Sequence, residues 1–499
     1  MRLAVSLAAS IAFAVAACGD DTTANDGDDT GGTTGTSEGE SSTTTSAADD
    51  AVDSSGVAPT SASEGAAPPA LEYARGIRLS RLIANQAVQV ELVVDGVTVD
   101  PATHTSRLVS GRRTLVRAFW SLHAGFEPRE LVGRLIVGYP DGSELVDDRV
   151  EMVDGESIDK GPSFQWLLDP DDVQAGMTLR VQALEPDVAA ASGEVSDPPP
   201  ILPYESALAL PVHEAVLEMK VVLIPVLHQL DGCEQVPVPT EEDVAAIAAQ
   251  LEQNNALQSA MVTVGEPMPY TDPIGGQDNG FSPVLTALAM QRETDAPDPN
   301  VYYYGLLMPC DGFPPGLLGQ AIGIPPSPTK ELAYQRVSTG RWQGTGAATA
   351  ETLVHEVGHT QGRRHVLCSG GEGGPDPSYP HENGRIGVWG FGIHDFQLRA
   401  PTSARDYMTY CANEWVSDYG WEQTLDVIET LTSWDFEDGG ESSRDGVLVG
   451  AIHADGSSTW WTARGAPPAT SSDARVVWTI EGLEVVRAAH AEPMPDGTA

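Results

Sequence analysis

The expected fold turns on the stretch HEVGHTQGRRH, which runs from His355 to His365. Two histidines four residues apart on a helix project from the same face, so the imidazoles of His355 and His359 can bind one ion. Glu356 lies between them, and its carboxylate can reach a water on that ion. Gly362 can adopt a positive φ, which lets the chain turn and bring His365 back as a third ligand. Three neutral imidazoles leave the fourth tetrahedral position open, which is typical of a catalytic rather than a structural zinc site.

With all its specified residues matched, the stretch resembles the H-E-x-x-H-x-x-G-x-x-H signature of the metzincin metalloendopeptidases. The resemblance implies one catalytic Zn²⁺ held by His355, His359 and His365. It also implies that a zinc-activated water hydrolyses peptide bonds, with Glu356 as general base. Two simpler interpretations stand beside it. The helix carries surface histidines by coincidence, or the protein keeps zinc without activity.

A second stretch, DYMTY from Asp406 to Tyr410, resembles the metzincin Met-turn. The resemblance implies that Met408 forms an apolar floor beneath the three imidazoles, a role that suits its adaptable side chain. It also places Tyr410 where some metzincin families carry a tyrosine that reaches the zinc or the developing oxyanion. The alternative for Tyr410 is a tyrosine that serves packing. The subfamily stays unassigned.

The segment from Leu317 to Ile324 resembles the edge strand that metzincins place beside the active-site cleft. There a substrate peptide adds as an extra antiparallel strand, which gives affinity through the main chain with little demand on sequence. The alternative is an ordinary interior strand.

The beginning of the chain predicts export. Residues 1–18 combine Arg2, an apolar run and small residues before Cys18, as a bacterial lipoprotein signal does. Lipidation of Cys18 places the protein on the outer membrane or cell surface; ordinary cleavage after Ala17 gives a secreted protein. Residues 19–70 are mostly Thr, Ser, Gly, Ala and acidic residues, which predicts a disordered acidic linker because nothing there can form a core.

Composition limits the partners. The formal net charge of −45 over 499 residues argues against binding nucleic acid or anionic lipid through a basic face. The expected partners are protein or glycoprotein substrates, with the membrane reached only through the N-terminal lipid. The sequence leaves open the oligomeric state and any structural calcium.

Besides Cys18, the chain has Cys233, Cys310, Cys368 and Cys411. An even number of cysteines in an exported protein predicts disulfides, and three connectivities are possible. Pairing Cys368 with Cys411 clamps the two sides of the metal site and leaves Cys233 for Cys310. Free buried thiols are the alternative.

The pattern of elements predicts a multidomain protein. Residues 71–213 carry short strands separated by turn residues, which favours an antiparallel β-sandwich. Residues 214–435 alternate strands and helices, which suits an α/β (α+β) metzincin-like catalytic domain, and residues 436–499 predict a short C-terminal β module. Helices are expected at 240–254, from Ser282 as the capping residue, and from about Ala347. Strands are expected at 219–227, 259–265 and 301–308.

The competing function is a non-catalytic surface protein, either a zinc-stabilised adhesin or a glycan-binding lipoprotein. Trp460 and Trp461 can stack on a sugar, although packing in a small β core is the more ordinary use of two such side chains. The isolated histidines, which are His104, His123, His381 and His394, are expected to do other work than binding the metal.

Overall fold

The computed structural model describes residues 71–188, 191, 193–275, 280–368, 373–436, 446–468, 474–480, 483–492 and 496–498. The predicted signal 1–18 with Cys18 and the predicted linker 19–70 lie outside the described residues. The chain forms two compact units, one of residues 1–58 and 471–491 and one of residues 59–470 and 492–499. In the first unit, the described residues form a hairpin of β27 (Arg475–Ile480) and β28 (Leu483–Ala488).

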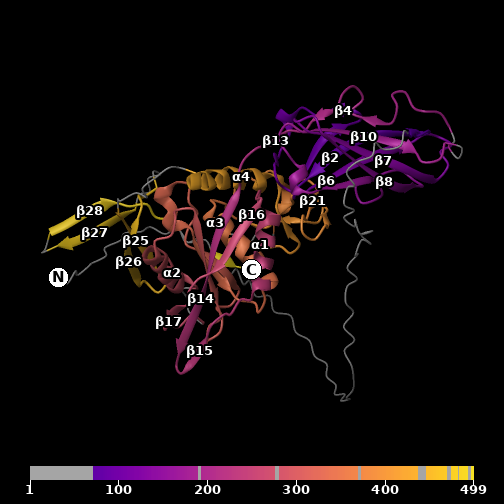
Figure 1. Cartoon of the computed structure of the whole chain (residues 1–499). Helices are drawn as coiled ribbons and strands as arrows, with labels where there is room; N and C mark the ends of the chain where they lie inside the picture. Colours follow the sequence, from indigo (N-terminus) through magenta and orange to yellow (C-terminus); the bar gives the residue numbers. More distant parts are fainter. Residues whose placement is uncertain are drawn as a thin grey trace, which may run out of the picture. The chain divides into compact units, whose positions relative to one another are not determined.

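The described part of the second unit is mostly β, with a few helices and several sheets, which fits a multidomain α+β protein (Figure 1). Its α-helices are α1 (Glu241–Asn254), α2 (Ser282–Asp295), α3 (Gly346–Thr360) and α4 (Asp418–Ser433). Its 3-10 helices are η1 (Pro101–Thr103), η2 (Pro170–Asp172), η3 (Lys330–Gln335), η4 (Glu382–Gly384) and η5 (Trp434–Phe436).

Two antiparallel sheets precede the helices. The first has the order β4 (Val97–Thr98), β3 (Gln89–Val94), β2 (Ile77–Asn85), β6 (Thr114–Leu122) and β9 (Phe164–Leu168). The second has the order β1 (Glu72–Tyr73), β10 (Thr178–Glu185), β7 (Arg129–Gly138) and β8 (Glu144–Val153), with β11 (Ile201–Leu202) and β12 (Leu208–Ala209) also on β10. Alternate residues of both sheets, such as Leu82 of β2 and Leu135 of β7, contribute to one hydrophobic core.

The third sheet is mixed and carries the helices. Its order is β15 (Cys233–Gln235), β14 (Glu218–Leu230), β18 (Val301–Leu307), β20 (Val337–Arg341), β19 (Leu317–Ala321) and β29 (Asp496–Thr498), and β16 (Ser259–Val264) and β17 (Met268–Tyr270) also pair with β14. Strands β16, β17 and β18 run parallel to β14, and β20 runs parallel to β18. Strand β19 is antiparallel to β20, and β29 is antiparallel to β19.

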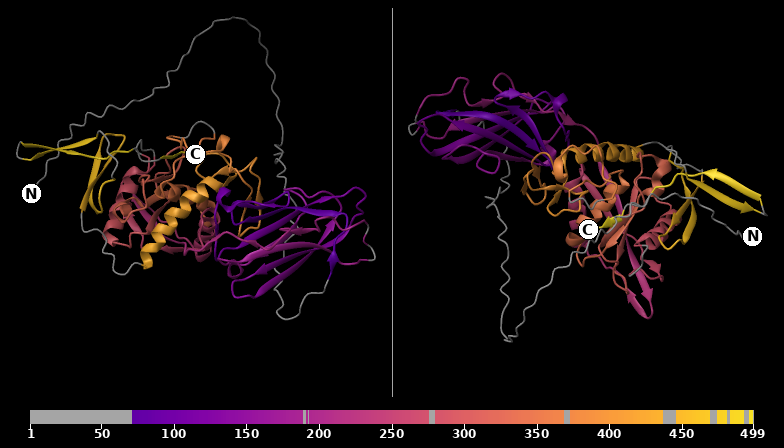
Figure 2. Two further views of the ribbon diagram at one scale, coloured as in Figure 1. Left: turned by 90° about the horizontal axis from the view of Figure 1, so that it is seen from above. Right: turned by 180° about the vertical axis from the view of Figure 1, so that it is seen from behind.

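The helices lie around this sheet (Figures 1 and 2). Side chains that alternate along β14 and β18 pack in two different cores, one on each face of the sheet. Val221 and Tyr304 share a core with residues of α1, α3 and α4. Ile224 and Tyr303 share a second core with residues of α2 and with Trp461. Helix α3 therefore lies on a buried sheet face. Trp461 packs in the second core, and stacking of Trp460 on a sugar stays a prediction.

Four further pairs of strands lie in the described part of the second unit. They are β5 (Leu108–Val109) with β13 (Val212–His213), β21 (Gly390–Phe391) with β22 (Leu398–Arg399), β23 (Arg405–Asp406) with β24 (Glu414–Trp415), and β25 (Gly446–Ile452) with β26 (Ser458–Arg464).

The local predictions for the helices mostly hold. Thr240 and Asp243 form a capping box at the start of α1, and the helix ends at Asn254 as expected. One capping assignment was wrong: Phe281, and not Ser282, is the N-cap of α2. The Ser282 hydroxyl instead lies 2.8 Å from Nδ1 of His453, because a residue of the β25–β26 hairpin competes for it.

A fully buried arginine links the antiparallel sheets to the helical part of the second unit. The Arg112 guanidinium donates to the carbonyl oxygens of Leu257 and Glu252, the latter at 2.7 Å, and to that of Gln86 at 2.8 Å. Burial lowers the pKa of Arg112 to about 9. The three carbonyl partners supply the hydrogen bonds that a buried guanidinium requires.

Candidate metal centre

The end of α3 sets the geometry of the predicted ligands. The helix begins after Thr345, whose side chain accepts from the Ala348 N–H, and it ends at Thr360. The next turn places Gly362 at φ +91°, and the Arg363 N–H returns to the Gly358 carbonyl at 3.0 Å. A Cβ at Gly362 would lie 2.9 Å from the Pro325 carbonyl oxygen, so both the backbone angle and the space require glycine.

The structure brings His355, His359 and His365 together as a buried group (exposures of 6%, 0% and 3%). Each imidazole places Nδ1 against a backbone carbonyl oxygen. The distances are 2.7 Å to Tyr407, 2.8 Å to Arg363 and 2.6 Å to Gly373. Because a carbonyl oxygen can only accept, each Nδ1 carries the proton, and each neutral ring then presents an unprotonated Nε2.

Burial keeps the rings of His355 and His359 neutral. It lowers the pKa of His355 to about 3, helped by the neighbouring His365, and it lowers that of His359 well below its usual value. Neutral imidazole is the form that ligates metals.

The inward nitrogens fit a shared cation. Nε2 of His359 and Nε2 of His365 lie 3.1 Å apart, and two lone pairs facing each other at that distance repel unless a cation lies between them. Nitrogens bound tetrahedrally at about 2.1 Å from one ion stand about 3.4 Å apart. Nε2 of His355 is buried without a hydrogen-bond partner, as an atom reserved for a ligand would be. This three-histidine group can bind a metal ion.

Glu356 is buried between α3 and strand β19 (exposure 1%). A Cβ added at Gly319 of β19 would lie 2.6 Å from Cγ and 2.7 Å from Oε1 of Glu356. The Glu356 carboxylate also contributes to raising the pKa of the buried Tyr304 hydroxyl, after burial itself. The sequence offered no role for Gly319, whose missing side chain lets the strand pass this close to the carboxylate.

The second predicted stretch lies against the three-histidine group. Met408 is fully buried, and its Sδ would lie 2.6 Å from a Cβ at Gly358, so this unspecified position of the motif needs glycine for close packing. The Tyr410 hydroxyl is 2.8 Å from Nε2 of His365, and the Tyr410 and His355 rings stack with centroids 5.9 Å apart.

A buried ion pair, not foreseen from the sequence, supports both stretches. Arg363 Nη2 lies 3.3 Å from Oδ1 of Asp406, and the two side chains are 2% and 0% exposed. The Asp406 carboxylate also accepts from the N–H groups of Met408 at 3.0 Å and Ser417 at 3.3 Å. Burial lowers the pKa of Arg363, but Asp406, Tyr407 and Tyr379 together outweigh burial, so the pKa is raised. Because the Arg363 carbonyl orients His359, the pair also helps to hold a ligand.

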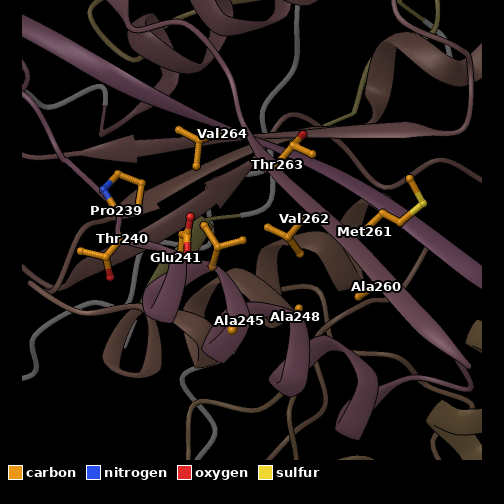
Figure 3. A pocket seen from close by; sticks show the side chains of 11 residues that line it. Pro239, Thr240, Glu241, Ala245, Ala248, Ala260, Met261, Val262, Thr263 and Val264 are labelled. Atoms are coloured by element: carbon orange, nitrogen blue, oxygen red, sulfur yellow. The ribbon is translucent and has the colours of Figure 1, made fainter.

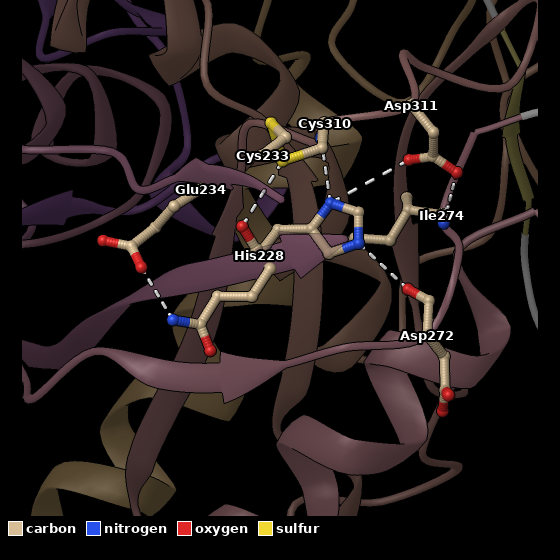
Figure 4. The surroundings of a disulfide bond; sticks show 8 residues. His228, Cys233, Glu234, Asp272, Ile274, Cys310 and Asp311 are labelled. Carbon is tan, nitrogen blue, oxygen red and sulfur yellow. Dashed lines mark hydrogen bonds and ion pairs between the residues drawn. A yellow bond between two sulfur atoms is a disulfide. The ribbon is translucent and has the colours of Figure 1, made fainter. Parts of the chain in front are cut away.

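Two disulfides confirm the prediction of disulfide bonding. Cys368 is bonded to Cys411, and Cys233 is bonded to Cys310. Figure 4 shows the second of these beside His228, a fully buried histidine that the sequence analysis did not single out. Nδ1 of His228 accepts from the Cys310 N–H at 2.9 Å, and Nε2–H donates to the Asp272 carbonyl at 3.0 Å. Both ring nitrogens are thus used in holding two loops together.

Two of the histidines expected to stay off the metal have acidic side-chain partners. Nε2 of His381 lies 2.6 Å from Oδ1 of Asp418, and Nε2 of His394 lies 2.7 Å from Oε2 of Glu252. In the antiparallel part, His104 is the C-cap of η1, and the His123 N–H donates to the Gly76 carbonyl.

An apolar groove of about 530 Å³ lies away from the histidines, between α1 and β16 (Figure 3). Its lining includes Val244 and Ala248 of α1 and Met261 and Val264 of β16. It contains none of the predicted site residues.

Comparison with models of known protein families finds no match, and comparison with curated proteins finds none either.

The two disulfides favour an extracellular or periplasmic location, because thiols stay reduced in the cytoplasm. None of the helices in the described part of the chain combines the length and apolarity needed to cross a membrane. What the fold and the site define is a disulfide-bonded α+β protein with a buried group of three histidines that can bind a metal ion.

Proposed function

We propose that this protein is a zinc-dependent endopeptidase of the metzincin type. One observation carries the proposal: three imidazoles, each fixed through Nδ1, come together beside the buried Glu356 of α3, the helix that also carries His355 and His359. A structural zinc site uses four protein ligands, whereas three histidines with an adjacent carboxylate are the set of a hydrolytic site.

His355, His359 and His365 would hold the ion. Zinc in such a site would supply Lewis acidity, lowering the pKa of water to about 7. Glu356 accepts a proton from the attacking water and passes it to the leaving amine. Tyr410, with its hydroxyl 2.8 Å from Nε2 of His365, is positioned to donate a hydrogen bond to the developing oxyanion.

The substrates we propose are extended segments of extracellular proteins or glycoproteins. They would pair with β19, whose backbone passes Glu356 at Gly319. The proposal includes the finer architecture, with a β-sandwich ahead of a metzincin-like catalytic domain and a short β module after it. It also includes export and anchoring through a lipid on Cys18, and it excludes nucleic acid because of the charge of −45.

The test separates metal binding from proteolysis. Unfolded casein should be cleaved, a chelator should stop cleavage, and zinc should restore it. Glu356→Ala should keep zinc, measured by elemental analysis, and lose at least about a hundredfold in kcat. His359→Ala should lose both zinc binding and proteolysis.

Two results would contradict the proposal. Unchanged turnover in Glu356→Ala would remove the general base, and full zinc occupancy in His359→Ala would remove the ligand set. Zinc binding without cleavage of any protein would favour the non-catalytic adhesin or glycan-binding lipoprotein.

A further inference from the structure

Strand β29 covers the edge of the third sheet that borders the candidate site. Its three residues pair antiparallel with β19, so that Thr498 lies opposite Leu317, Gly497 opposite Gly319, and Asp496 opposite Gln320. From the sequence, β19 could be either an edge strand that accepts a substrate peptide or an interior strand. In the structure, β19 has β20 on one side and β29 on the other.

The covered edge passes close to the Glu356 side chain. Thr352 and Glu356, one turn apart on α3, both approach Gly319, since a Cβ there would lie 2.8 Å from Cγ2 of Thr352 and 2.6 Å from Cγ of Glu356. The residue of β29 opposite Gly319 is Gly497. A strand in this register therefore lies alongside the backbone that passes the carboxylate.

A second point of contact supports the same path for the chain. Beyond the end of β19, a Cβ at Gly323 would lie 3.0 Å from Oε1 of Glu492. The Glu492 carboxylate also contributes to raising the pKa of Tyr334, after burial. Glu492 thus lies near one end of β19 and Thr498 near the other, which agrees with the antiparallel pairing of residues 496–498.

We propose that Glu492 and residues 496–498 act as a built-in competitor that occupies the strand-addition site of this enzyme. The inference rests on the proposed function. Strand addition depends on main-chain hydrogen bonds, so a segment of the chain itself and an extended substrate compete for the same donors and acceptors of β19. Tethering gives such a segment a local concentration of about 1 mM, enough for a weak three-residue strand to hold the edge reversibly.

A binding experiment tests the competition without catalysis. In the Glu356→Ala background, a fluorescein-labelled peptide of residues 492–499 is titrated against the full chain and against a chain ending at Ala491, with fluorescence anisotropy as the readout. If the edge is covered about four fifths of the time, the truncated chain binds about fivefold more tightly. A peptide of the same sequence with N-methylated backbone nitrogens at residues 496–498 is the control, because it lacks the main-chain donors of the strand, and it should bind neither chain.

A point variant guards against misfolding of the truncated chain. Gly497→Pro in the full chain removes a backbone donor and should raise peptide affinity as the truncation does. Equal affinity of the full and truncated chains, or failure of the truncated chain to bind the peptide, would overturn the proposal.

Kinetics supply the second readout. Removing the competitor should lower KM for an extended peptide about fivefold and leave kcat unchanged, and the free 492–499 peptide should raise KM again. A truncation that lowers kcat and leaves KM unchanged would mean that the segment has only a structural role. If no form cleaves protein, the peptidase proposal fails, whereas the anisotropy titration still decides whether the segment covers β19.

Discussion

Replacing Asp406 by asparagine tests how the buried ion pair supports the metal centre. Asparagine keeps the size and shape of the side chain but removes its charge. Arg363, 2% exposed, would then hold a buried positive charge without its partner at 3.3 Å. The side chain at position 406, which also accepts from the N–H groups of Met408 and Ser417, would keep only one acceptor oxygen.

The expected loss follows from the burial. Removing one partner of a buried ion pair destabilises a protein by about 3–5 kcal/mol, because the remaining charge stays desolvated. Asp426→Asn is the matched control, since Asp426 pairs with Arg107 but is 72% exposed. An exposed pair contributes about 1 kcal/mol or less. Metal affinity should fall about 10–100-fold in Asp406→Asn only, because the Arg363 carbonyl orients His359.

Urea unfolding followed by tryptophan fluorescence measures the stability of both variants, with the metal removed beforehand. Competition with a chromophoric chelator then measures their zinc affinity. A free energy of unfolding within about 1 kcal/mol of the parent, together with unchanged zinc affinity, would refute the supporting role of the Arg363–Asp406 pair. A buried pair that supports a ligand cannot behave like an exposed one.

Three further predictions concern single residues around the site. Gly362→Ala should destabilise the protein more than Gly125→Ala and should weaken metal binding. Both glycines have positive φ (+91° and +85°), but only at Gly362 would the new Cβ meet a carbonyl oxygen, that of Pro325, at 2.9 Å. Equal losses of unfolding free energy in the two variants would show that this contact is irrelevant. Burial, with the nearby charges of Glu351 and Asp406, raises the pKa of Glu414 to about 9, so the folded protein holds this proton more tightly than the unfolded chain and loses stability as the pH rises from 4.5 toward 9. Glu414→Gln should therefore raise the free energy of unfolding by up to about 5 kcal/mol near pH 8 and leave it unchanged near pH 4, and a gain at both would disprove the titration. Tyr410→Phe should lower kcat about 10–100-fold at unchanged zinc affinity, whereas an unchanged kcat would assign Tyr410 to packing.

Local sequence was enough for the elements and for the candidate ligands. The i, i+4 spacing of His355 and His359 depends only on helix geometry, and the capping box at Thr240 depends only on neighbours three residues apart. Gly362 is informative for the same reason, since a positive φ is a property of one residue. These features could be predicted because the interactions that cause them lie within one or two turns of the chain.

Tertiary structure decided what orients and covers those ligands. The proton of each imidazole is placed by a carbonyl, and for His355 that carbonyl belongs to Tyr407 in a distant segment. Ser282 was mistaken for a cap because its hydroxyl is taken by His453, which no local pattern reveals. The pairing of Asp496–Thr498 with β19 likewise joins segments far apart in sequence. Such contacts leave no period in the sequence, because hydrogen bonds and ion pairs between distant segments depend on where the packed sheets and helices bring them.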